Sequence, residues 1–203
     1  MNYKNSRDAT WQILIKNKVS SLPVSVEKIC RNEKIKLFTY GEGENIIKKL
    51  NLSDNTVSND AFSIGRVIFY DDTKPKTRQR FSIAHEIGHI VLHLHNQTGP
   101  TVLNREISCD DNPLESEANI FASRILAPLC VLHYLNVSSA EEISEICNIS
   151  LIAAQIRYQR LCEIRNRDLE MKKIKGYGCF LLSPLERTVY NNFKDYISKN
   201  QRS

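Results

Sequence analysis

The stretch RFSIAHEIGHIVLH, residues 80–93, carries three of the five histidines of the chain in a segment that is otherwise mostly apolar. Its apolar residues recur at the spacing of an amphipathic helix. On such a helix, at about 100° per residue, His85, Glu86 and His89 share one face and the isoleucines lie across from them. The stretch therefore predicts a helix that is anchored by its apolar side and presents histidines on the other side.

His85, Glu86 and His89 form the pattern H-E-x-x-H. Two imidazoles one helical turn apart can bind the same zinc ion, and the glutamate between them reaches the water on that zinc. Zinc lowers the pKa of this water to about 7, and the glutamate takes its proton and passes it to the leaving amine. The pattern predicts peptide-bond hydrolysis with one Zn²⁺ per chain, both histidines as ligands and Glu86 as the catalytic base.

A catalytic zinc site needs a third protein ligand, and residues 113–126 predict a second helix that offers two glutamates. Glu115 and Glu117 lie about 200° apart around that helix, so only one of them can face the metal. Small residues share the side of Glu115 and would let the two helices approach closely, so we expect Glu115 to be the ligand. Glu117, or an aspartate of CDD at residues 109–111, stays an alternative, and Glu115 also suits a capping box on Asn112.

Two further residues are expected near the metal. Asn119 lies one turn after Glu115, where it can orient a ligand by a hydrogen bond. His93, two turns after His85, is expected to support the ligands or to pack, because a catalytic zinc needs only three protein ligands. The sequence does not identify the residue that stabilises the oxyanion.

Composition indicates an ordinary soluble globular protein. The chain has 203 residues, 41% hydrophobic and 25% charged, and its net charge of +5 is too small to argue for nucleic acid as a partner. Six cysteines without a CxxC pair, and an N-terminus without a secretory apolar region, predict reduced thiols and a cytoplasmic location. No apolar run approaches the roughly 18 residues that a membrane helix needs, so we expect no membrane partner.

Periodicity before the histidine segment predicts helices around a small sheet, an α+β fold. The expected elements are helices at residues 8–19 and 21–32, a strand at 35–40, a glycine-rich turn, GEGE, at 41–44, and a strand pair at 61–72 that bends about Gly65.

The C-terminal part is expected to be helical. Residues 141–161 predict two short helices joined at 148–150 that resemble a DNA-reading helix-turn-helix, but neighbouring glutamates offset the arginines that follow. We therefore favour a small helical subdomain that packs on the rest and grips a partner, and DNA binding stays the alternative. A capping box at 183–186 predicts a last helix with one apolar stripe. We divide the chain into domains at residues 1–135 and 136–203.

The two site motifs together resemble those of the ImmA/IrrE metallopeptidases, zinc proteases of the gluzincin type. RQRFSIAHEIGHIVLH, residues 78–93, is similar to the active helix of that family. ESEANIFASRILAP, residues 115–128, is similar to its second motif, in which Glu115 matches the third zinc ligand. With the similar flanking segments, the resemblance covers most of residues 20–165 and implies a zincin-like fold, to which residues 136–203 add the helical, helix-turn-helix-like subdomain.

The resemblance also implies a substrate. Characterised family members are intracellular and cleave or inactivate helix-turn-helix repressors, which derepresses prophage, mobile-element or stress genes. The alternative is a regulator or toxin-like component that binds a partner protein or DNA without proteolysis, with a vestigial or structural zinc site. We also expect the strand Val67, Ile68, Phe69 and Tyr70 to be a sheet edge on which an extended peptide pairs by its backbone.

Overall fold

The structure is a computed structural model that describes residues 3–49, 60–93, 112–175 and 182–201. It is mainly helical with one three-stranded sheet, so the predicted α+β class is confirmed. Contacts between residues divide the chain into two compact units, residues 1–10 with 25–122 and residues 11–24 with 123–203. The predicted domain boundary at residue 135 stays a prediction.

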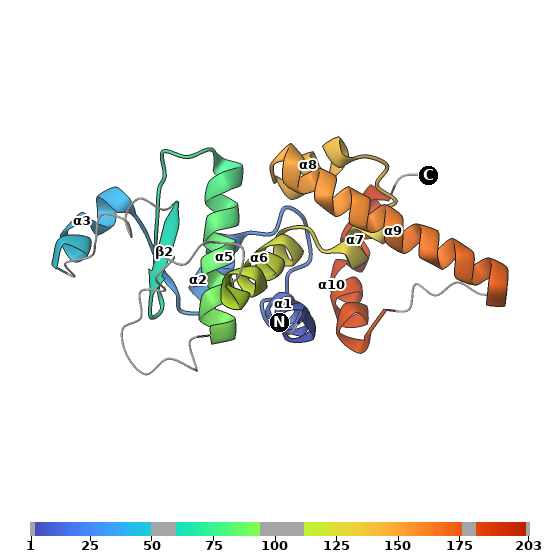
Figure 1. Ribbon diagram of the computed structural model, residues 1–203, viewed down its shortest axis with the longest axis horizontal. Coiled ribbons are helices and arrows are strands. Elements are labelled where there is room, and N and C mark those ends of the chain that lie inside the picture. The colour runs from blue at the N-terminus through green and yellow to red at the C-terminus, as the bar shows by residue number, and fades with distance from the viewer. Residues whose placement is uncertain (1–2, 50–59, 94–111, 176–181, 202–203) are drawn as a thin grey trace. The chain divides into compact units, whose positions relative to one another are not determined.

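The first unit contains the sheet and the helices around it (Figure 1). Its elements are α1 (Tyr3–Lys16), α2 (Val26–Asn32), β1 (Lys36–Thr39), α3 (Tyr40–Lys49), β2 (Ala61–Ile64), β3 (Val67–Tyr70), α5 (Lys76–His93) and α6 (Pro113–Leu126); α1 and α6 also contribute residues to the second unit. The hairpin of β2 and β3 turns at Gly65 as expected. Gly65 has a φ of +57°, a left-handed conformation that glycine adopts without steric cost.

The strand predicted to be a sheet edge is the central strand, which corrects that expectation. The strand order is β1-β3-β2. Val67, Ile68, Phe69 and Tyr70 each pair in parallel with β1 on one side and antiparallel with β2 on the other. Both edges of β3 are therefore occupied by neighbouring strands, and a peptide cannot add to it.

Helices α3 and α5 cover opposite faces of this sheet (Figure 1). One face carries the rings of Phe38, Phe62 and Phe69, which stack at centroid distances of 5.9 and 5.1 Å. The side chain of Phe69 lies against Gly43 of α3. Successive side chains of a strand point to opposite faces, so Ser63, which follows Phe62, points toward α5.

The segment GEGE forms part of helix α3, and the predicted turn is wrong. The reason is a capping box at TYGE: the Thr39 hydroxyl accepts a hydrogen bond from the Glu42 backbone N–H, and the Glu42 carboxylate accepts one from the Thr39 backbone N–H. The two reciprocal bonds satisfy N–H groups that a helix start otherwise leaves open. Two glycines close together suggested a turn, but at least Gly43 serves the packing on Phe69.

Replacing Gly43 with alanine is expected to lower the free energy of unfolding by about 1–3 kcal/mol, the usual cost of an overpacked core. A Cβ there would lie 2.5 Å from Cδ1 of Phe69, whose ring is buried and cannot move aside. Gly41→Ala is the matched control, because its nearest atom would be Oγ1 of Thr39 at 3.9 Å. Urea unfolding measures both. Equal midpoints for the two variants would contradict the packing of α3 on the sheet.

Helix α5 is longer than the stretch 80–93 and is buried on both sides. It begins at Lys76, and the amide of Gln79 closes the preceding loop by donating to the carbonyls of Asp72 and Lys74. The face that carries His85 and Glu86 is buried as fully as the isoleucine face. The expected helix with an apolar side and a histidine side is present, and both sides are buried.

The second unit is helical. Its further elements are α7 (Leu129–Tyr134), α8 (Ala140–Cys147), α9 (Leu151–Lys175) and α10 (Pro184–Asn200). Asn148, in the left-handed conformation, ends α8 before the turn to α9. The predicted short second helix is wrong, because α9 has 25 residues without a glycine or proline to interrupt it.

The last helix agrees with its sequence. The capping box between Ser183 and Glu186 is present. Val189, Phe193 and Ile197 of the expected apolar stripe are buried, and α10 packs on α7.

Two findings bear on the expected environment of the chain. Among the described helices, none combines the length and the apolarity needed to cross a bilayer. The described cysteines, Cys30, Cys130, Cys147 and Cys162, have free thiols, while Cys109 and Cys179 lie outside the described residues. Burial raises the pKa of the Cys30 and Cys130 thiols to about 12, so both stay protonated at neutral pH.

Candidate metal centre

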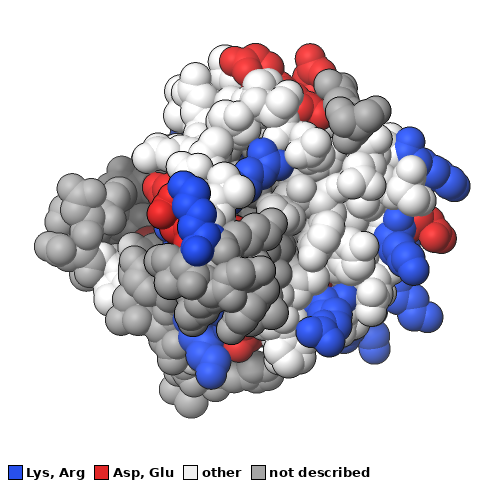
Figure 2. Space-filling view, turned by 90° about the vertical axis from the view of Figure 1, so that its right-hand side faces the viewer, with Lys and Arg blue, Asp and Glu red and all other residues white. Residues whose placement is uncertain are grey.

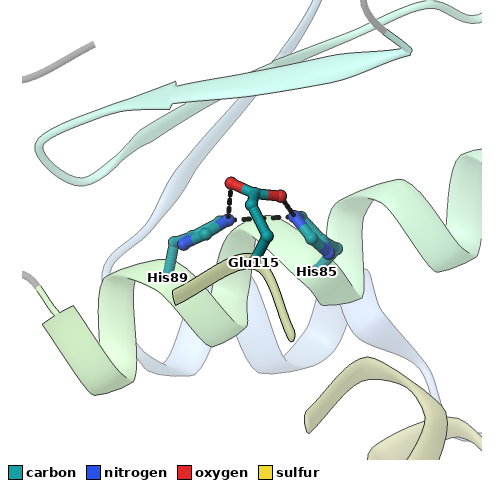
Figure 3. A group of neighbouring side chains, drawn as sticks. All are labelled: His85, His89 and Glu115. Atoms are coloured by element: carbon teal, nitrogen blue, oxygen red, sulfur yellow. Dashed lines mark hydrogen bonds and ion pairs between the residues drawn. The ribbon is translucent and has the colours of Figure 1, made fainter. Parts of the chain in front are cut away.

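Three side chains from two helices of the first unit point toward one another (Figure 3). His85 and His89 lie one turn apart on α5, and Glu115 reaches them from α6. Nε2 of His85 lies 2.9 Å from Nε2 of His89 and 3.1 Å from Oε2 of Glu115. Nε2 of His89 lies 3.2 Å from Oε1 of the same carboxylate. The three residues could therefore hold a metal ion.

The spacing fits a tetrahedral metal. Ligand atoms about 2.0–2.2 Å from a tetrahedral zinc ion lie about 3.3–3.6 Å from one another. The distances of 2.9, 3.1 and 3.2 Å here are only a few tenths of an ångström shorter. Small rotations of the three side chains are enough to admit the ion.

The hydrogen bond between His85 and Asn119 also favours a cation between His85 and Glu115. Nδ1 of His85 donates to the amide oxygen of Asn119 at 2.9 Å. A neutral imidazole with its proton on Nδ1 has a lone pair on Nε2, and this lone pair faces a carboxylate oxygen of Glu115, which is also an acceptor. Two acceptors at 3.1 Å repel each other unless a proton or a metal ion lies between them.

The Glu115 carboxylate is held in its charged form. Burial raises the pKa of this carboxyl group, but hydrogen bonds and charge from His85 and His89 outweigh burial and hold the pKa well below its usual range. An ionised carboxylate beside two imidazoles is the ligand set of zinc sites that keep a fourth position for water or substrate.

The structure separates the two glutamates that the sequence left open. Oε2 of Glu117 lies 3.9 Å from Nε2 of His93, and Glu117 is not part of the converging group. His93 is buried, and its ring centroid is 5.6 Å from that of His89. Burial, together with His89, lowers the pKa of His93, and Glu117 only partly offsets this. His93 thus packs beside the site, whereas the alternative ligands Asp110 and Asp111 lie outside the described residues.

Glu86 is next to His85 in the chain but is not part of the group of His85, His89 and Glu115. Its side chain is buried, and Oε2 accepts a 2.7 Å hydrogen bond from the hydroxyl of Ser63 on β2. Sequence reasoning missed Ser63. The available signal was weak: a single hydroxyl in the short apolar strand AFSI, at a position whose side chain the alternation of the strand directs toward α5.

Gly88 explains how close α5 and α6 come at the site. A Cβ on Gly88 would lie 3.2 Å from Cα of Ala118 and 3.1 Å from Cδ1 of Phe121. The close approach expected from the small residues of α6 is thus present, and Gly88 is the partner that the sequence reading overlooked. Because Gly88 has no side chain, helix α6 can lie close enough to α5 for Glu115 and Asn119 to contact the histidines.

Replacing Asn119 with alanine is expected to weaken zinc binding about 10-fold, at the lower end of the range for residues that orient metal ligands. The effect is at the lower end because Asn119 is itself exposed, so water can take its place on Nδ1 of His85. Competition with a chelating dye measures the affinity. Ser116→Ala, on the same helix, is the control and should bind zinc as the unmodified protein does. If the Asn119→Ala variant binds zinc with unchanged affinity, Asn119 does not orient His85 for metal binding.

Comparison with known families agrees with this geometry. The model of the IrrE N-terminal-like domain family, Peptidase_M78, matches residues 44–158, more than half of the chain. The matched region contains both site helices and strands β2 and β3. A comparison with curated proteins finds no match.

Proposed function

Because the chain belongs to the Peptidase_M78 family, whose model describes an IrrE N-terminal-like domain, we propose that it is a zinc-dependent endopeptidase of the gluzincin type with a zincin-like fold. His85, His89 and Glu115 hold the metal in this proposal. The family supports a metallopeptidase, and the observation that carries the proposal is the convergence of two Nε2 atoms and one carboxylate beside a buried glutamate.

Each residue of the site then has a distinct task. The histidines and Glu115 bind the ion, and Asn119 fixes the ring of His85 by its Nδ1 proton. Zinc at this place supplies positive charge that polarises the peptide carbonyl and makes water more acidic. Glu86 accepts a proton from the attacking water and delivers it to the nitrogen of the leaving amine.

We propose that the substrate is a helix-turn-helix repressor in the cytoplasm, whose cleavage derepresses prophage, mobile-element or stress genes. The resemblance of both site motifs to the ImmA/IrrE metallopeptidases supports this choice. Within the described residues β3 is the only sheet neighbour of β2, and Ser63 of β2 reaches Glu86. An extended segment of the repressor can therefore pair along the outer edge of β2, next to the catalytic base.

The test is incubation of the purified protein with the helix-turn-helix repressor encoded nearest to its gene, with zinc and with a chelator. The proposal expects a defined repressor fragment that forms with zinc and not after chelation. Readdition of zinc should restore the cleavage. An intact repressor under all conditions, or a fragment that forms equally in chelator, would contradict it.

A helix-turn-helix-like role for residues 136–203 is part of the proposal, as a grip on the partner rather than on DNA. Arg157 is buried and donates to the carbonyl of Ala127, and Arg165 donates to the carbonyl of Val137. Arg160 pairs with Glu163. Arg157 and Arg165 are thus engaged within the second unit, and the charge of the exposed Arg160 is offset by Glu163.

The surface of this region gives a second reason to disfavour DNA. Ile152 and Ile156 are 72% and 63% exposed near the start of α9, where a DNA-reading helix carries its base contacts. In the face shown in Figure 2, acidic side chains lie beside the lysines and arginines, including those gathered along the right-hand side of the view. Binding to phosphates depends on clustered positive charge, so a DNA-binding regulator is the weaker candidate function.

A further inference from the structure

The hydrogen bond between Ser63 and Glu86 joins residues that are 23 positions apart in the chain. Its length of 2.7 Å is that of a well-formed hydrogen bond from a hydroxyl to an oxygen acceptor. The bond links strand β2 directly to the catalytic helix. Metal binding by His85, His89 and Glu115 does not require this hydrogen bond.

Ser63 is held firmly in place. It pairs with Ile68 in the register of β2 and β3, and Ile68 is fully buried. A donor on a paired strand changes position less than a donor on a loop. The serine hydroxyl is therefore a fixed point for the side chain of Glu86.

Fixing one carboxylate oxygen also fixes the other. The terminal torsion of a glutamate side chain is broad when nothing constrains it. With Oε2 on the Ser63 hydroxyl, the plane of the carboxylate is defined. General-base catalysis depends on this position, because a displacement of about 1 Å can cost roughly 100-fold in rate.

We infer that Ser63 is a positioning residue that holds the Glu86 carboxylate in the orientation for proton transfer. The inference rests on the proposed peptidase function. Ser63 contributes to the chemical step through Glu86 alone, so its removal affects kcat and leaves KM and zinc content unchanged.

Two variants of the same shape test the inference. Ser63→Thr keeps the hydroxyl and Ser63→Val lacks it, and both β-branched residues suit a strand. The valine variant is expected to lose roughly 10-fold in kcat, part of the loss that misplacing a catalytic group can cause, with KM and zinc content within about twofold. The threonine variant should regain most of the rate. Ser138→Ala is the control, because it removes a serine hydroxyl from a different carboxylate, Glu142, and should not alter kcat.

Infrared spectra of the metal-free protein give a readout independent of activity. The carboxylate stretch of Glu86 should differ between the threonine and valine variants, and the difference should vanish when Glu86→Gln is added to both. Identical spectra, or equal kcat for the two variants, would overturn the inference while the peptidase function stands. An unmodified protein that cleaves no repressor would instead overturn the proposed function, and the inference with it.

Discussion

Replacing Glu86 with glutamine is expected to lower kcat by about 10²–10⁴-fold, the contribution of a general base, with zinc still bound. The amide has the same shape and can still accept the hydrogen bond from Ser63, but it cannot take a proton. Glu86 is not among the three converging residues, so its change leaves the ligand set intact. Elemental analysis and steady-state kinetics on one preparation measure both effects.

The same variant distinguishes a protease from a regulator that acts by binding. A non-proteolytic component keeps its effect on the repressor when only the base is lost. The peptidase account expects Glu86→Gln to bind the repressor and to leave it intact, in vitro and in cells. Unchanged derepression by this variant would favour the regulator with a vestigial or structural zinc site.

Replacing Glu115 with glutamine is expected to weaken zinc binding by more than about 100-fold, beyond the range for residues that only orient a ligand. The change removes the negative charge from the site and replaces one of the two carboxylate oxygens with an NH₂ group, which cannot bind a cation. The carboxylate also faces both histidines, and the variant leaves only one uncharged oxygen in its place.

Glu117→Gln is a closely matched control. The two glutamates lie on one helix, and their side chains are 16% and 15% exposed. Of the two, only Glu115 lies within 3.2 Å of His85 and His89. The control variant should bind zinc as the unmodified protein does. Equal losses in both variants, measured by dye competition, would show that general charge and not coordination governs the affinity.

Much of the site could be predicted from the sequence because its signals are local. The H-E-x-x-H spacing depends only on helical periodicity, which also places Glu115 and Glu117 on different sides of α6. The structure brings His85, His89 and Glu115 together and puts Asn119 on the second nitrogen of His85. The capping box at Ser183 was recognised for the same reason, since its signal spans four residues.

The errors arise where distant segments decide the structure. Strand β3 looks like an edge in the sequence because its parallel partner β1 precedes it by about 30 residues, and no local pattern reports such a pairing. The glycines of GEGE suggested a turn, whereas the capping box at Thr39 and the ring of Phe69 favour a helix there. Ser63 was missed because its partner lies on another element.

Anomalous diffraction at the zinc absorption edge, from crystals of the protein loaded with one equivalent of zinc, tests the central claim most directly. The account predicts one peak per chain, bonded at about 2.0–2.2 Å to Nε2 of His85, Nε2 of His89 and the carboxylate of Glu115. A peak at other residues, or no peak with these three side chains turned apart, would contradict it.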